Sequence, residues 1–196
     1  MVVLAPQYLG SVEYYAAMAT ADVAVIDMDM RFDKRVKSVH RTVIAGNRGP
    51  IQLTVPIRHP KGTDIDRPLR WSDILVSDHN HWWTEHAAAL ESAYGRCPYF
   101  EHYYPDIHAL LTDRWVDRPV TELDCALDAV IRRQTGIQTR LSVTIPAGAE
   151  GYTDLRRANV AELYPTAPYR QIRQESMGFI AHMSVLDRLF NLGPNA

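Results

Sequence analysis

The residues best suited to chemistry stand in the first loop of the chain. Gln7 and Tyr8 follow an apolar run, residues 1–5, and precede an amphipathic stretch, residues 11–20. The amide of Gln7 can hold a ligand hydroxyl or polarise a carbonyl, and Tyr8 supplies a phenol. The alternative is a plain turn in which Tyr8 only packs on the following helix. We favour a binding role, because loops after buried parallel strands often carry ligands.

Three carboxylates accompany the next apolar run, residues 22–26. Asp22 opens this run, and Asp27 and Asp29 come just past it. Side chains alternate along a strand, so Asp27 and Asp29 are expected on one face. They could orient a base, hold a ligand hydroxyl or bind a divalent cation through oxygen, and two close carboxylates tend to raise one pKa. The alternative is a strand end that pairs with the basic residues beyond it.

A basic stretch follows the carboxylates. Residues 31–41 hold five cations in eleven positions, although the net charge of the whole chain is −2: Arg31, Lys34, Arg35, Lys37 and Arg41. Lys34 and Arg41 could clamp the phosphates of an anionic ligand. The alternative is a solvated charged face with no ligand.

His86 is the candidate general base. It lies in a helix predicted over residues 82–94, behind Trp82, which is expected to be partly core and partly pocket wall. An unperturbed pKa near 6.5 would suit deprotonation of an amine at neutral pH. The alternative is a helix histidine that bonds a backbone carbonyl or faces water.

A metal site is not expected. His79 and His81 could share a face, but His81 and His86 are five positions apart and diverge on a helix. Cys97 could be a nucleophile, yet a lone cysteine in a turn is more often a small packed side chain. These residues indicate no particular cofactor, and the cofactor stays unknown.

Composition narrows the class of protein. Of 196 residues, 46% are hydrophobic and 22% charged, which is ordinary globular usage. No global positive charge draws in DNA, and two cysteines are too few for a disulfide framework. Residues 1–5 are too short for a signal peptide, and no apolar run approaches the roughly 20 residues of a membrane span. We expect a cytoplasmic protein with no membrane insertion.

The opening of the chain predicts a βαβ unit. Apolar runs at 1–5 and 22–26 flank the helical stretch 11–20, with Ser11 as a plausible N-cap. The carboxyl end of the first strand is then a ligand edge, and free amides in the first helical turn favour an anion.

The remaining pattern predicts one α/β domain over residues 1–196, with a parallel or mixed sheet, packed helices and a β-hairpin insertion at 42–56. Helices are expected at 82–94, at 104–115 with Pro105 in the first turn, at 121–134 and at 184–190. Strands are expected at 74–77 and 137–145, and an irregular region with one helical turn at 147–168.

Segments spread over nearly the whole chain together resemble the WbqC-like protein family. The first half contributes residues 6–9, Tyr14, Ala21-Asp22, Asp29, Phe32, Lys34, Arg41 and Val55-Pro56. The second half contributes Trp82, Glu85-His86, Tyr94, residues 98–100, 184–187 and 189–191, and Gly193. The order and spacing of these segments carry the resemblance.

The resemblance implies a transferase of bacterial surface-polysaccharide (O-antigen) biosynthesis, which adds a small acyl or aminoacyl group, such as glycine, to a nucleotide-linked amino sugar. His86 would be the base, and Asp22 or Asp29 would orient it or the substrate. Gln7 and Tyr8 would hold the sugar, and Lys34 and Arg41 the phosphate of the nucleotide sugar, of a carrier phosphopantetheine or of a tRNA end. Asp27 and Trp82 are further expected substrate-binding residues.

Two other functions stay open at this stage. The first is a non-catalytic binding or scaffold protein in the same pathway, which would keep its role without His86. The second is a metal-dependent hydrolase, which would be purified with bound zinc or manganese.

Overall fold

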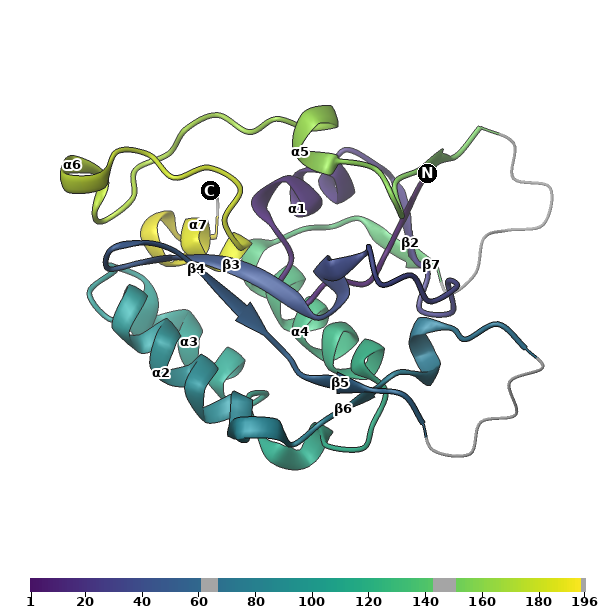
Figure 1. Cartoon of the computed structure of the whole chain (residues 1–196). Coiled ribbons are helices and arrows are strands. Elements are labelled where there is room, and N and C mark those ends of the chain that lie inside the picture. The colour runs from purple at the N-terminus through teal and green to yellow at the C-terminus, as the bar shows by residue number, and fades with distance from the viewer. Residues whose placement is uncertain (61–66, 143–150, 195–196) are drawn as a thin grey trace.

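The predicted βαβ opening is present and forms the centre of a four-stranded sheet. The structure, a computed structural model, describes residues 1–60, 67–142 and 151–194 (Figure 1). The strand order is β7 (Arg140–Ser142), β2 (Val23–Ile26), β1 (Val2–Leu4) and β8 (Thr153–Asp154), and all neighbours are parallel. The expected α/β fold with a parallel sheet is therefore confirmed.

Burial and capping explain why the opening folds this way. Strand β1 is buried along its whole length, as expected for a central parallel strand between two neighbours. Helix α1 (Val12–Ala19) begins at Ser11, whose hydroxyl accepts a hydrogen bond from the Tyr14 amide at 3.2 Å. The N-cap predicted at Ser11 is confirmed.

The hairpin insertion is also present. Strands β3 (Arg41–Gly46) and β4 (Gly49–Thr54) pair antiparallel, with Ile44 opposite Ile51. The Tyr94 hydroxyl accepts from the Ala45 amide at 2.9 Å and so fixes the hairpin on helix α2 (Trp82–Tyr94). A second small pair joins β5 (Ile57–Arg58) to β6 (Leu75–Val76), which confirms the strand predicted near 74–77.

Two more predicted helices form close to their expected limits. Helix α4 (Val120–Thr135) buries the apolar stripe Leu123, Leu127 and Ile131, and it ends at Gly136 in the left-handed conformation, φ 70°. Helix α7 (Val185–Leu192) is capped by Ser184.

The helix predicted at 104–115 is wrong in its limits. Helix α3 (Phe100–His108) starts earlier, so Pro105 lies inside it rather than in the first turn. Phe100 and Tyr104 stack at 4.4 Å, and Ile107 completes the buried stripe. Burial of Phe100 favours a helix that starts before Pro105. The proline removes one backbone hydrogen bond of this helix.

The late part of the chain differs most from prediction. The strand expected at 137–145 is found as β7, and residues 143–145 lie outside the described residues. The region expected to be irregular holds the short strand β8 and the helical turn α5 (Val160–Leu163), and α6 (Gln174–Met177) follows. Strand β8 is polar and only two residues long, so no apolar pattern marks it; the Leu155 amide bonds the Val3 carbonyl at 2.8 Å.

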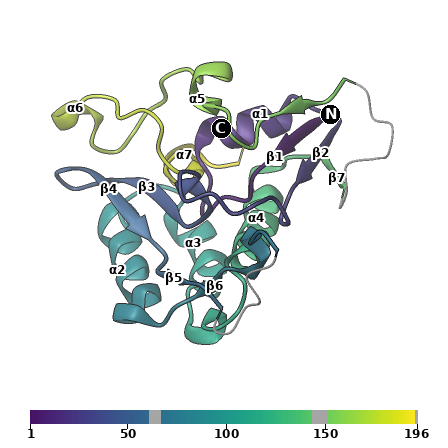
Figure 2. The same ribbon diagram turned by 45° about the vertical axis from the view of Figure 1, so that its right-hand side comes forward.

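Figure 2 shows how the layers are arranged. Hairpin β3–β4 runs between helices α2 and α3 on one side and the C-terminal segment with α5 and α6 on the other. Among the residues that the structure describes, no helix is long and apolar enough to cross a membrane. The parallel strands β1, β2 and β8 end at one edge of their sheet, and the loops that follow them build the candidate site.

Candidate functional site

An open groove lies at the carboxyl edge of the parallel sheet, and we call it the sheet-edge groove. It consists of two hollows of about 640 Å³ and 280 Å³ that share Gln7, Ser38 and Ala158. The larger is the cationic half, lined among others by Arg35, Lys37, Arg156 and Arg157. The smaller is the histidine half, lined among others by Glu13, Arg41 and His182. This is the edge where open α/β folds bind ligands.

Gln7 stands where the two halves meet. Strand β1 delivers it to the sheet edge, and the Tyr8 amide donates to the Ser38 carbonyl at 3.0 Å, which holds the loop in place. Its side-chain oxygen accepts from the Ser11 amide at a long 3.4 Å. The structure therefore places Gln7 in a position to meet a ligand, as the sequence predicts.

Tyr8, Trp82 and His86 form a buried cluster beneath the groove. The Tyr8 hydroxyl lies 2.8 Å from His86 Nδ1, and Trp82 Nε1 donates to the Ser77 carbonyl at 3.1 Å. The side chains of Tyr8 and Trp82 are buried; Tyr8 still lines the histidine half, whereas the pocket-wall role of Trp82 stays a prediction that its burial does not favour.

His86 does not have the ordinary pKa that the sequence suggested. It is 4% exposed, and burial lowers its pKa to about 4, partly offset by a backbone hydrogen bond with Thr54. At neutral pH the imidazole is therefore uncharged and enclosed, and the base role for His86 stays a prediction that the geometry does not favour.

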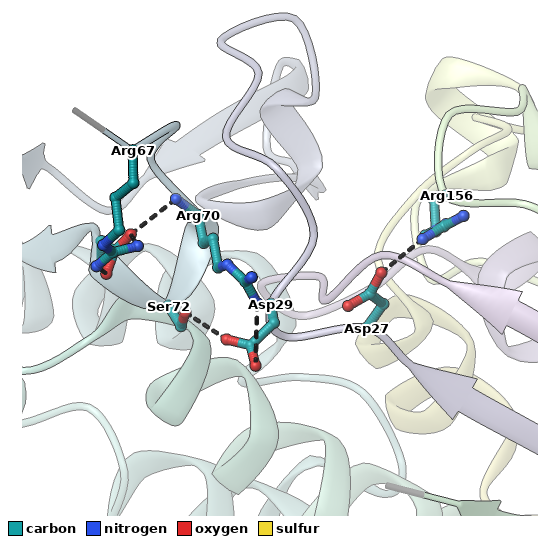
Figure 3. Close-up of polar contacts among 7 residues, drawn as sticks. Asp27, Asp29, Arg67, Arg70, Ser72 and Arg156 are labelled. Carbon is teal, nitrogen blue, oxygen red and sulfur yellow. Dashed lines mark hydrogen bonds and ion pairs between the residues drawn. The ribbon is translucent and has the colours of Figure 1, made fainter. Parts of the chain in front are cut away.

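The predicted carboxylates do not form one cluster. Asp27 and Asp29 were expected on one face, but β2 ends at Ile26 and the chain turns, so their side chains diverge (Figure 3). Asp27 pairs with Arg156 at 2.6 Å. Asp29 accepts from the Ser72 hydroxyl at 2.5 Å and lies 3.8 Å from Arg70. The expected shared face is wrong, because strand alternation ends with the strand.

Asp22 lies away from the groove. It immediately precedes β2, so it stands at the amino end of that strand, whereas Asp27 follows the carboxyl end. Its carbonyl accepts from the Arg140 amide at 3.2 Å. The structure therefore does not bring Asp22 together with the other predicted site residues.

The basic stretch contributes to the groove, but the residues that line it are not all those that the sequence predicts. Arg35 bonds Asp33 at 2.9 Å and lines the cationic half beside Lys37. Lys37 has no ion pair among the described residues, whereas exposed Lys34 does not line either half. Arg31 lines an adjoining hollow. Lys37 thus takes the position in the groove that the sequence assigned to Lys34.

Arg41 occupies the histidine half as the first residue of β3. Its Nε is buried and has no hydrogen-bond partner within the described ranges. A guanidinium with an unused buried donor suits an anionic or carbonyl ligand, since such a group costs free energy when unpaired.

Arg156 and Arg157 are functional candidates that the sequence reasoning missed. They follow β8, and each is held by carboxylates: Arg156 by Asp27 and Asp154, Arg157 by Asp33 at 3.1 Å. Hydrogen bonds from Arg35 lower the pKa of the Asp33 carboxyl well below its usual range. Because β8 has no sequence signature, nothing indicated that these arginines reach the groove.

A second missed pair is Glu13 and His182. Glu13, in the first turn of α1, is buried and accepts from His182 Nδ1 at 2.9 Å. The available signal was a glutamate flanked by Val12 and Tyr14 in a stretch that is otherwise mostly apolar.

The amino end of α1 is less open to an anion than predicted. The Val12 amide donates to the Met183 carbonyl at 3.0 Å, and the Tyr14 amide donates to Ser11. Glu13 adds a carboxylate in the same turn. The Val12 and Tyr14 amides are thus already paired, so these two are not free for an anion, contrary to the expectation.

Metal and thiol chemistry find no support in this geometry. Within the described part of the chain, no three His, Cys, Asp or Glu side chains gather closely enough to hold a metal ion. Cys97 is buried, and burial raises its pKa to about 12.

A model of the WbqC-like protein family matches residues 5–162. The chain belongs to the WbqC-like family. No curated protein and no solved structure matches it. The family match includes Gln7, Glu13, Arg41 and Arg156 and ends before His182. Most of the sheet-edge groove is thus built from the region that this WbqC-like protein shares with its family.

Proposed function

We propose that this protein is a transferase of bacterial surface-polysaccharide (O-antigen) biosynthesis that adds a small acyl or aminoacyl group to a nucleotide-linked amino sugar. One observation carries the proposal. Lys37 and Arg41, cations without an ion pair among the described residues, lie in the two halves of one groove, and Gln7 stands where these halves meet. Membership of the WbqC-like family supports the proposal.

The cations suit the diphosphate of a nucleotide sugar. Lysine gives a point charge and arginine a forked donor, and a nucleotide sugar carries two linked phosphates. Arg35, Arg156 and Arg157 are already paired with aspartates, so they add shape and a moderate positive potential rather than free charges. The diphosphate is therefore assigned to Lys37 and Arg41.

Gln7 is assigned to the sugar or to the acyl carbonyl. Its amide nitrogen can donate to a hydroxyl or to a carbonyl oxygen on which negative charge develops. The groove is open, so a donor attached to an acyl carrier or a tRNA end can approach it from outside. The reaction joins the sugar nitrogen to the acyl carbon and releases the carrier.

Binding is tested first, by thermal unfolding with UDP-glucosamine. UDP-glucose, which lacks the amine, is the matched ligand control. Ligand at about 100 times its Kd stabilises the fold by about 2.7 kcal/mol, a Tm rise of roughly 5 °C or more at this size. We expect Lys37→Ala and Arg41→Ala to lose most of this shift, and Arg48→Ala, at the hairpin turn away from the groove, to keep it.

Turnover is tested next, with two glycyl donors: a thioester of N-acetylcysteamine and 3′-O-glycyl adenosine. An amide product of UDP-glucosamine in the mass spectrum supports the transferase and identifies the donor type. Binding without product from either donor would instead favour the non-catalytic binding protein. No thermal shift with UDP-glucosamine, or equal loss in Arg48→Ala, would overturn the assignment of the groove.

A further inference from the structure

Glu13 and His182 combine a buried carboxylate with an exposed imidazole. The side chain of Glu13 is 3% exposed and that of His182 is 64% exposed, and 2.9 Å separates Oε1 from Nδ1. Both residues line the histidine half of the groove together with Arg41 and Gln7. The carboxylate therefore occupies one ring nitrogen and leaves Nε2 as the nitrogen available to the groove.

The backbone holds His182 rigidly. The residue has a positive φ of 62°, which is uncommon for a residue other than glycine. The Val12 amide donates to the Met183 carbonyl at 3.0 Å, and the Ser184 amide donates to the Val43 carbonyl at 2.7 Å. The two residues that follow His182 are therefore both fixed by backbone hydrogen bonds. Such strain is retained where the surrounding structure fixes it, often at functional sites.

A purely stabilising ion pair accounts poorly for this arrangement. An ion pair with one exposed partner contributes little, at most about 1 kcal/mol. The second oxygen of Glu13, Oε2, is buried without a hydrogen-bond partner among the described residues, and that carries a desolvation penalty. The burial of the Glu13 carboxylate next to His182 therefore lowers the stability of the fold.

We infer that the Glu13–His182 pair is the proton acceptor of the sheet-edge groove. The inference rests on the proposed transferase. The sugar amine attacks the carbonyl of an activated acyl ester, and a C–N bond forms. His182 Nε2 takes the amine proton and returns it to the leaving thiolate or alkoxide as the C–S or C–O bond breaks. The products are an amide and a thiol or alcohol, and the imidazole ends neutral.

In this step His182 is the catalytic residue and Glu13 is a positioning residue. Glu13 fixes the tautomer with the proton on Nδ1, so that the lone pair of Nε2 faces the amine. Gln7 lines the same hollow and is available to the acyl oxygen, while Arg41, which also lines it, keeps its phosphate role. The pair therefore complements the phosphate-binding role of Lys37 without sharing its residues.

The tautomer is measured directly, without any substrate, by long-range 1H–15N NMR at about pH 8.5, where ordinary imidazoles are neutral. His182→Gln assigns the signal. We expect the Nδ1–H tautomer in the wild type and loss of that preference in Glu13→Leu, with no change in Glu101→Gln, a first-turn glutamate of α3. If Glu13→Leu fails to fold, Glu13→Met, which likewise lacks an oxygen acceptor, replaces it. The Nε2–H form in the wild type would overturn the inference.

Turnover supplies the second readout, with UDP-glucosamine and the donor that supports product. We expect His182→Gln to lower kcat about 100-fold or more with little change in KM, and Glu13→Leu to lower kcat less. His79→Gln, an exposed histidine away from the groove, keeps wild-type kcat. Product formed by His182→Gln at the wild-type rate would refute the dyad and leave the transferase intact. A wild type without product would refute the transferase, while the tautomer result would still decide whether Glu13 orients His182.

Discussion

The hydroxyl of Tyr8 lies 2.8 Å from Nδ1 of His86, which joins the first loop to helix α2 beneath the groove. Both side chains are buried, so neither loses its partner without leaving a polar atom unpaired. The contact makes His86 a support for the loop that carries Gln7.

Tyr8→Phe tests this support. The variant leaves His86 Nδ1 without its buried partner, and we expect the free energy of unfolding in urea to fall by about 1–2 kcal/mol. Tyr99→Phe, at an exposed tyrosine, is the matched control and should stay within about 0.5 kcal/mol of the wild type. Equal effects of the two changes would mean that the Tyr8 bond contributes nothing.

The burial of His86 predicts acid sensitivity. Its pKa is about 4 in the folded protein and near 6.5 when unfolded, so the unfolded chain binds more protons between these values. The free energy of unfolding is therefore unaffected by the protonation of His86 above pH 6.5, and it decreases as the pH falls toward 4. We expect the loss to reach about 2.5 kcal/mol by pH 4.5. Urea unfolding of wild type and His86→Gln at pH 7.5 and 4.5 measures it.

The comparison isolates His86 from other titrating groups. The variant should lack this share of the pH dependence, whereas His102→Gln, at an exposed histidine, should retain it. A His86→Gln curve parallel to that of the wild type from pH 7.5 to 4.5 would contradict the burial of a neutral imidazole.

The burial of Asp124 predicts the opposite pH dependence of the free energy of unfolding. Neither carboxyl oxygen has a hydrogen-bond partner among the described residues, and burial together with Asp128 raises its pKa well above the usual value. Because the folded form binds the proton more tightly, Asp124 destabilises the fold increasingly as pH rises above about 4. We expect Asp124→Leu to raise the free energy of unfolding at pH 7 by about 1–3 kcal/mol.

The gain from Asp124→Leu should shrink toward pH 4, since the carboxyl is then protonated in the folded state and about half protonated in the unfolded state. Chemical unfolding at the two pH values gives the difference. Asp78→Asn, at an exposed aspartate, is the control and should change little. A variant less stable than the wild type at pH 7 would reveal a stabilising partner for Asp124.

Asp27 and Asp22 test the topology of the proposed site. Asp27 follows the carboxyl end of β2 and holds Arg156, whereas Asp22 precedes the strand. Under the proposed function, Asp27→Asn removes a negative charge beside the groove and should tighten binding of UDP-glucosamine about 2- to 5-fold. Asp22→Asn should leave the Kd unchanged in calorimetric titration. Equal shifts in the two variants would contradict the placement of the ligand at the carboxyl edge.

Sequence patterns predicted the local elements and the groove residues that lie next to them in the sequence. The βαβ opening, the hairpin and helix α2 follow from periodicity and turn residues, and each involves neighbours in sequence. Gln7 and Arg41 reach the groove because one follows the first strand and the other starts the hairpin. These positions depend on local structure, which is why they could be foreseen.

The groove residues from the C-terminal part of the chain, Arg156 and His182, could not be foreseen from local patterns. Arg156 reaches Asp27 only because β8 pairs with β1, and two polar residues carry no signature of that strand. His182 reaches Glu13 through tertiary bonds to Gly10 and Val12. His86 was misjudged for a related reason, since a helix period shows which face is apolar but not how deeply it is buried.

The bonds that tie the first loop to the segment before α7 also affect when the groove can form. The Val12 amide bonds Met183, and the Val185 amide bonds Gly10 at 2.9 Å. During synthesis on the ribosome, Gln7 and Glu13 emerge long before His182, so the histidine half lacks a wall through most of translation. Closing so distant a contact carries a large loop entropy, which places completion of the groove among the last events of folding. Nascent chains should therefore lack a complete histidine half until residues 182–185 have left the ribosome.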